Sequence, residues 1–264
     1  MIRKTLCLCT IFCAAPLHSA WAGAWTQQQG KGLVIATLAH SVADSGFGDA
    51  GQGAPVADFR KTELRAYLEY GVTDWATFVA QPEWRDKKTG SGQGEAVRGL
   101  GRIDAGFRLR LWSDDSRVVS VQATGRMPGA SDDLAPANGG DTDWEADARV
   151  LYGRGFSLFG RHAFTDMQVG YRVRFGAPAD ELRLDVTAGI DVTPKVLALA
   201  QSFNSVSVGS AEAPFLPTRE HKVSASLVYR YDDAWSFQIG GLATIAGRNA
   251  LRERGAILGL WRSF

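Results

Sequence analysis

The chain has 264 residues, and its 29 Lys and Arg residues balance 28 Asp and Glu residues to a formal net charge of +1. Apolar residues make up 45% of the chain and aromatic residues 10%, which excludes a low-complexity disordered protein. The balanced charge, without a basic block, argues against nucleic acid as a partner. After the first twenty or so residues, no stretch approaches the roughly 18 apolar residues that a membrane-spanning helix needs. The 30 glycines instead favour many tight turns.

The beginning of the chain has the features of a secretory signal peptide. Arg3 and Lys4 form a positive n-region, residues 5–16 are apolar, and residues 20–22, Ala-Trp-Ala, form a small-x-small cleavage site. An N-terminal membrane anchor is the alternative, but the apolar stretch is too short and lacks a stop-transfer pattern. We therefore expect a signal peptide over residues 1–22 and one folded domain over residues 23–264.

All the cysteines of the chain lie in this signal segment, at Cys7, Cys9 and Cys13. None of them follows the Leu-small-small pattern of a lipoprotein signal. The exported protein therefore has no cysteine, and we expect it to fold without disulfides.

After the signal segment, apolar and polar residues alternate with a period of two almost everywhere, which is the pattern of half-buried β-strands. In one such segment Leu182 and Leu184 occupy one face, and Arg183 and Asp185 occupy the other. We predict about twelve strands, an even number as bacterial outer-membrane barrels have. Their expected spans are 31–44, 60–73, 75–88, 101–113, 116–128, 143–157, 162–176, 180–193, 195–210, 221–232, 235–248 and 253–264.

The connections between these strands alternate in length. Short turns fall near 73–74, 113–116, 157–161, 193–194 and 232–234, and glycine- and acid-rich loops fall at 45–59, 89–100, 130–142 and 211–220. Short periplasmic turns and long external loops are typical of outer-membrane barrels. A soluble β-sandwich is the alternative, but its inward faces would be apolar, whereas here they include charges such as Arg108 and Arg172. The pattern predicts an all-β fold, an antiparallel transmembrane β-barrel of about twelve strands.

The end of the chain resembles the closing strand of Gram-negative outer-membrane barrels. Apolar residues alternate at Leu258 and Leu260, and the strand ends in Phe264, although Arg262 stands where an apolar residue is usual. This resemblance implies the outer membrane as location, membrane lipid as a partner, and the barrel assembly machinery as a partner that recognises Phe264 as an assembly signal. Residues 69–78, Glu-Tyr-Gly-Val-Thr-Asp-Trp-Ala-Thr-Phe, also resemble a hairpin of outer-membrane transporters of the phenol-degradation meta-pathway type, which implies uptake.

A lipid hydrolase is an enzymatic alternative, since several outer-membrane barrels have a Ser-His pair. His40 and Ser41 are adjacent on a predicted strand, so they point to opposite faces and cannot form such a pair. His221 lies beside Glu220, and no extended hydrolase motif surrounds it. The sequence therefore gives no catalytic residue that we would assign.

An acidic loop offers two further alternatives, a protease and a cation site. An omptin-type protease needs acidic and His residues from several loops, whereas Asp132, Asp133, Asp141 and Asp143 come from one. The pair Asp141 and Asp143 offers oxygen ligands to calcium, but no full ligand pattern follows. We expect no metal and no cofactor.

Inward-facing charges are the candidates for function, because a small barrel must fill or hydrate its interior and mixed charges do both. The candidate lumen residues are Glu63, Arg65, Glu69, Asp104, Arg108, Arg110, Arg172, Arg174, Arg183 and Asp185. The same parity turns Arg126, Glu145, Asp147, Arg149, Asp166, Glu181 and Arg230 inward. These charges indicate either a narrow polar pore or a salt-bridged interior that only holds the wall in shape. Since basic side chains outnumber acidic ones on the arginine-rich strands, we predict that such a pore attracts anions.

The sequence thus favours a passive channel or uptake pore for small solutes. The first alternative is a closed barrel that acts through its external loops as a structural or surface-interaction protein. An outer-membrane lipid hydrolase comes third. A planar-bilayer recording distinguishes the first two, because a pore gives discrete conductance steps and a closed barrel gives none.

Overall fold

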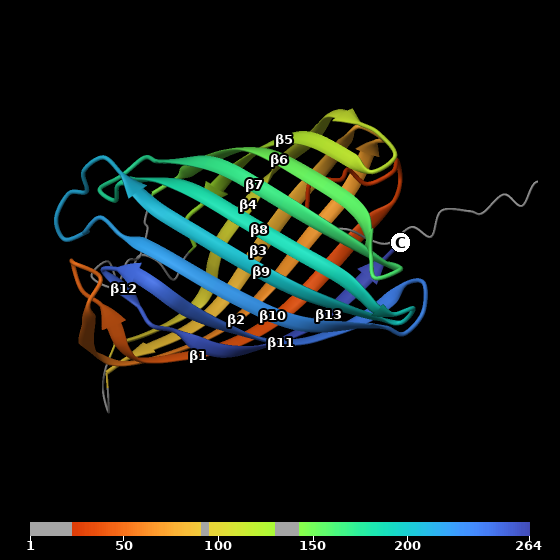
Figure 1. The fold of residues 1–264 in the computed structure, drawn as a ribbon. Helices are drawn as coiled ribbons and strands as arrows, with labels where there is room; N and C mark the ends of the chain where they lie inside the picture. Colours follow the sequence, from red (N-terminus) through yellow and green to blue (C-terminus); the bar gives the residue numbers. More distant parts are fainter. Residues whose placement is uncertain (1–22, 91–94, 130–142) are drawn as a thin grey trace, which may run out of the picture.

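Figure 1 shows the protein as a computed structural model that describes residues 23–90, 95–129 and 143–264. Within these ranges, twelve long antiparallel strands form one closed barrel, and a two-residue strand, β12, lies at one rim. The strands are β1 (Gly32–Phe47), β2 (Gly53–Thr73), β3 (Ala76–Thr89), β4 (Glu95–Ser113), β5 (Arg117–Met127), β6 (Glu145–Leu158), β7 (Arg161–Arg174), β8 (Asp180–Thr193), β9 (Val196–Val208), β10 (Arg219–Arg230), β11 (Trp235–Arg248), β12 (Ala250–Leu251) and β13 (Arg254–Ser263). In the described ranges, no helix is long and apolar enough to cross a membrane.

Strand β1 closes the barrel because it pairs with both β2 and β13. Leu33 lies opposite Glu69 of β2 and opposite Ser263 of β13. The remaining long strands pair in chain order, so the sheet has no free edge, as a sheet in lipid requires. The short strand β12 adds to β1 at the far rim through the pair Gly46 and Leu251.

The strand prediction is confirmed for all twelve spans, and most bounds agree closely. The first hairpin differs most, because the predicted loop 45–59 is largely strand: β1 runs to Phe47, which pairs with Gly53 at the start of β2. Strand β4 likewise begins at Glu95, inside the predicted loop 89–100. Glycine and acidic residues have a low intrinsic propensity for strands. Here the pairing with a neighbouring strand outweighs this low propensity. The predicted loop 130–142 lies outside the described residues.

The two faces of the barrel have the predicted parity. Leu64, Leu184 and Ile239 point outward and are 50%, 40% and 62% exposed, whereas the neighbouring Glu63 and Asp185 line the interior. A continuous exposed apolar surface suits a hydrocarbon environment. Aromatic side chains are exposed near the strand ends, where the membrane interface favours them, at Tyr70, Trp75, Trp112, Trp144, Tyr171, Tyr229, Tyr231 and Trp235.

The two ends of the barrel differ in their connections. We call the end with the short turns after β2, β4, β6, β8 and β10 the turn end, and the opposite end the loop end. The chain closes on itself at the turn end, where the Phe264 N–H donates to the Gly32 carbonyl at 3.0 Å. At the turn between β4 and β5, hydrogen bonds from the Arg117 guanidinium hold the pKa of the Asp114 carboxyl below its ordinary value. The recognition of Phe264 during assembly remains a prediction.

Candidate functional site

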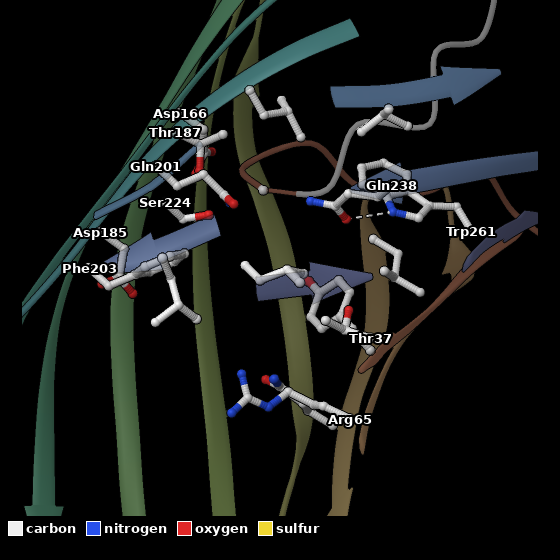
Figure 2. Close-up of a pocket in the computed structure, with 18 of the residues that line it drawn as sticks. Thr37, Arg65, Asp166, Asp185, Thr187, Gln201, Phe203, Ser224, Gln238 and Trp261 are labelled. Atoms are coloured by element: carbon white, nitrogen blue, oxygen red, sulfur yellow. Dashed lines mark hydrogen bonds between the residues drawn. The ribbon is translucent and has the colours of Figure 1, made fainter. Parts of the chain in front are cut away.

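The lumen contains a cavity of about 1230 Å³ that extends along the barrel. Its lining reaches from Lys222 in the loop half to Asp233 at the turn end. Figure 2 shows part of this lining, with Gln201 on one side of the view and Gln238 and Trp261 on the other. Side chains therefore fill part of the barrel interior, and the rest of it is open space.

The N-terminal segment, residues 23–31, enters the lumen from the turn end. Ala24 is fully buried; its N–H donates to Asp166 Oδ2 at 2.6 Å, and its carbonyl accepts a hydrogen bond from Ser120 Oγ at 2.6 Å. The Trp25 ring meets Phe164 edge-on, with ring centroids 6.2 Å apart. This segment fills the part of the lumen that lies against β5 and β7.

Strands β2 and β3 hold the rest of the segment. The Gln27 N–H donates to Thr77 Oγ1 at 2.8 Å, and the Gln29 N–H donates to Asp74 Oδ1 at 2.9 Å. The segment approaches β2 so closely that a Cβ on Gly71 would lie 2.0 Å from the Gln28 carbonyl oxygen. Only glycine fits at this position, because any side chain would push the segment off the wall.

Arg108 is the centre of a buried cluster that joins β2, β4, β5 and the N-terminal segment. The residue is 1% exposed, and its guanidinium donates to Glu69 Oε1 at 2.6 Å, to the Tyr67 hydroxyl at 2.8 Å and to the Trp25 carbonyl at 2.9 Å. Two more bonds, of 3.1 and 3.0 Å, go to Gln122 Oε1. The guanidinium therefore bonds at the same time to β2, to β5 and to the Trp25 carbonyl, and this last bond holds the N-terminal segment against the wall.

Interlocked ion pairs fill the loop half of the same side of the lumen. Glu145, whose side chain is 2% exposed, contacts Arg126 at 3.2 Å, Arg172 at 3.5 Å and Arg174 at 3.0 Å. Further pairs join Asp147 to Arg149 and Arg172, Asp185 to Arg149, Glu181 to Arg172, Arg174 and Arg183, Asp104 to Arg126, and Glu63 and Glu83 to Arg65. We call the lumen faces of β2 to β8, with these pairs and the Arg108 cluster, the charged wall.

The predicted lumen candidates lie on or beneath this charged wall. The cavity lining includes Glu63, Arg65, Asp104, Arg108, Arg172, Arg183 and Asp185. Glu69 is fully buried against Arg108, and Arg174 pairs with Glu145. Arg110 lies closer to the turn end, where its N–H donates to the Trp75 carbonyl at 2.8 Å. Most of these arginines contact carboxylates, so the opposite charges of the wall largely offset one another, and the attraction of anions remains a prediction.

The opposite side of the cavity is uncharged over most of its length. We call it the neutral wall; its residues are Ile35, Thr37, Ala39, Leu197, Leu199, Gln201, Ser224, Val228, Gln238, Leu242, Ile257 and Trp261. They come from β1, β9, β10, β11 and β13. Trp261 Nε1 donates to Gln238 Oε1 at 3.0 Å, the bond drawn in Figure 2. This wall therefore offers neutral side chains to the same cavity that the charged residues line from the other side.

The residues considered for hydrolase chemistry do not form a Ser-His pair in the structure. His40 Nδ1 lies 3.0 Å from Thr62 Oγ1, whereas Ser41 Oγ donates to Glu253 Oε2 at 2.8 Å inside the barrel. His221 Nδ1 pairs instead with Asn204 Oδ1 at 2.8 Å. Among the residues that the structure describes, no group of three or more His, Cys, Asp or Glu side chains is arranged to bind a metal ion. The acidic residues 132, 133 and 141 lie outside the described ranges.

Solved structures with the same architecture are outer-membrane barrels. The COG4313 outer-membrane channel from Pseudomonas putida F1 matches with a TM-score of 0.68 at 13% identity, over 93% of this chain and 100% of that chain. The NanC porin matches with a TM-score of 0.57 at 8% identity, over 88% and 100%. The chain has the fold of a Gram-negative outer-membrane β-barrel. No protein-family description and no curated protein matches the sequence.

This fold occurs in proteins with different activities. The translocator domain of the autotransporter NalP from Neisseria meningitidis also matches, with a TM-score of 0.51 at 10% identity, over 90% of each chain. Since channels, porins and translocators share the barrel, the fold alone does not identify the function, which depends on the residues that line the lumen.

The period-two pattern of the sequence does not reveal that the N-terminal segment lies in the lumen. A signal for it exists: residues 23–31 lie between the expected cleavage site and the first strand, and they contain Trp25 without any alternating pattern. An aromatic side chain there has no place in a strand and needs another apolar surface to cover it. Trp25 finds this surface on Phe164 and on the buried residues Val118 and Leu151.

Proposed function

We propose that this protein is an outer-membrane channel through which small solutes pass passively along the neutral wall. The observation behind this proposal is the cavity of about 1230 Å³, which extends from the level of Lys222 to Asp233. The turn end is then periplasmic and the loop end external, as short turns and longer loops are in other barrels. The structural neighbours that are named channels or porins support the proposal of a channel.

The lining favours small uncharged solutes. Along the neutral wall, amides and hydroxyls such as Gln201 and Ser224 alternate with apolar groups such as Leu199, so a neutral solute finds both hydrogen-bond partners and apolar contacts. An ion in the same place would lose hydration without gaining a fixed opposite charge. We expect neutral solutes to swell protein-containing liposomes faster than charged solutes of equal size.

The N-terminal segment sets the width of this passage. Trp25 packs against Phe164, and Phe164 lines the cavity, so removing the indole widens the passage. In planar bilayers we expect small discrete conductance steps from the unmodified protein and clearly larger steps from Trp25→Ala. The matched control is Trp144→Ala, because Trp144 is 57% exposed near the loop end of β6 and its loss should leave the steps unchanged.

The closed structural barrel remains the competing function, and the ion pairs of the charged wall are the observation that favours it. A closed barrel gives no steps in the unmodified protein and none in Trp25→Ala. That pair of results would overturn the channel proposal. Equal conductance of Trp25→Ala and Trp144→Ala would overturn the role of the segment.

A further inference from the structure

Asp166 of β7 is a buried carboxylate without a cationic partner in the described part of the chain. It is 2% exposed, and its hydrogen bonds come from the Ala24 N–H at 2.6 Å and from Gln168 Nε2 at 2.8 Å. Every other buried carboxylate contacts a cation: Glu69, Glu145, Asp147 and Asp185 contact arginines, and Glu253 contacts Lys61 and Lys222. Burying a lone charge is strongly unfavourable, so Asp166 lacks a partner that the other carboxylates have.

The chain itself brings a backbone nitrogen to this carboxylate. A Cβ built on Gly23 would lie 2.7 Å from both Cγ and Oδ2 of Asp166, which places the Gly23 Cα within about 4 Å of the carboxylate. The Gly23 nitrogen is one bond of about 1.5 Å from this Cα, so it lies within roughly 6 Å of the carboxylate, close enough for a charge on it to interact with Asp166. Gly23 also has a φ of +130°, which only glycine adopts readily, so no larger residue fits between the chain and Asp166.

Removal of the signal peptide changes the chemistry of that nitrogen. Hydrolysis of the peptide bond between Ala22 and Gly23 adds one water molecule, leaving a carboxylate on Ala22 and a protonated amine on Gly23. The sequence places the expected cleavage at this bond, since Ala20 and Ala22 form the small-x-small site. Cleavage therefore creates a cation at the one buried carboxylate of the described residues that lacks one.

We propose that the new α-ammonium of Gly23 pairs with Asp166 and locks the N-terminal segment into the lumen after export. The pair forms only in the processed chain, so processing completes the interior of the barrel. Arg108 and Glu69 both act electrostatically on Asp166, but they pair with each other at 2.6 Å, so their charges largely cancel and Asp166 still lacks its own cation. The lock itself depends only on the fold; its effect on solute passage rests on the proposed channel function.

The first test measures the reactivity of the Gly23 amine in the folded, processed protein. An amine-reactive reagent is applied in detergent solution, and labelling of the N-terminal peptide is followed by mass spectrometry. Because pairing and burial both protect the amine, we expect labelling at least about tenfold slower than in the denatured chain. Asp166→Asn keeps the size of the side chain and removes its charge, so labelling should become clearly faster than in the unmodified protein, by the share of the protection that pairing supplies. Asp114→Asn, the same substitution at an exposed turn of the same end, should not change the rate.

Three results would overturn the lock. The amine of the folded protein could be labelled as fast as that of the denatured chain, or equally fast in the unmodified protein and in Asp166→Asn. The exported chain could also begin at a residue other than Gly23. None of these depends on conductance, so failure of the lock and failure of the channel proposal are separate outcomes.

A second test needs no change at Asp166 and covers the case that Asp166→Asn does not assemble. The barrel is refolded from a chain that begins at Gly23 and from a chain with one additional Ala before Gly23. The extra residue moves the ammonium by about 3.5 Å, beyond the carboxylate, without altering any residue of the barrel. We expect the extended chain to label fast and, if the barrel conducts, to give the larger steps of Trp25→Ala. Slow labelling of both chains would contradict the lock.

Discussion

The charged wall and the neutral wall face each other across one lumen, yet they differ in how their side chains use the space. On the charged wall, arginines and carboxylates bind one another and the N-terminal segment, with Arg108 alone contacting Glu69, Tyr67, Gln122 and Trp25. On the neutral wall, uncharged side chains such as Ser224 line the cavity. The inward charges of this small barrel are therefore mostly bound to one another, and for this reason we propose that the passage follows the side that has few charges.

The largest expected effect comes from breaking the charged wall at Arg108. Arg108→Met leaves Glu69, which has no exposed surface, without its cation, and removing one partner of a buried pair costs roughly 3–5 kcal/mol. We expect the temperature at which the folded form disappears in heat-modifiability gels to fall clearly. The double substitution Arg108→Met with Glu69→Gln removes both charges and should recover much of the loss.

Arg117 provides the control for that experiment. Its ion pair with Asp114 is exposed at the turn end, so Arg117→Met should hardly change the unfolding temperature. Equal losses in Arg108→Met and Arg117→Met would mean that the Arg108 cluster does not stabilise the charged wall.

We expect a somewhat smaller effect, on the yield of assembled barrel, when an arginine is placed on the lipid face of a strand and not on its lumen face. Leu184 of β8 points outward, and a charge facing lipid near the middle of the membrane costs roughly 2–4 kcal/mol, so Leu184→Arg should lower the yield of assembled barrel. Thr187 lines the cavity, where water and polar groups solvate a charge, so Thr187→Arg should assemble nearly normally. Similar yields for the two variants would indicate that β8 is shifted by one residue.

The sequence is sufficient to predict the strands and their faces, because alternation has a short period and each strand shows it locally. Leu184 and Asp185 fall on the predicted sides for this reason. Strand ends are less predictable, since β2 continues to Gly53 through pairing with β1 and not through its own residues.

The contents of the lumen are much harder to predict from the sequence. A period of two tells which residues face inward, but not which carboxylate each arginine meets across the barrel. The Ala24 N–H and Asp166, for example, are 142 positions apart in the chain. The N-terminal segment has no periodicity to reveal its place, and only the isolated Trp25 indicates that it needs a partner surface. For these reasons the sequence shows which charged residues face inward but not which of them neutralise one another, and their effect on a passing ion remains a prediction.

The smallest expected effect is a shift in reversal potential, and it distinguishes the two walls most directly. We compare two substitutions that each change the charge of one wall by one unit. Arg172→Gln removes a positive charge from the charged wall, where its partners Glu145 and Asp147 each retain another arginine. Ser224→Lys adds a positive charge to the neutral wall, where the Ser224 hydroxyl has no hydrogen-bond partner to lose among the described residues. If the barrel conducts, each changes the reversal potential in a salt gradient.

We expect the Ser224→Lys channel to shift its reversal potential toward anion preference, because the new ammonium stands beside the passage in a low-dielectric wall that focuses its field. The shift from Arg172→Gln should be opposite in sign and smaller, since the surrounding ion pairs redistribute around the lost charge. Ser224→Gln adds length without charge and should leave the reversal potential where it is in the unmodified protein. A larger shift from Arg172→Gln than from Ser224→Lys would place the passage along the charged wall, and the inward arginines would then control selectivity as their number on the strands suggests.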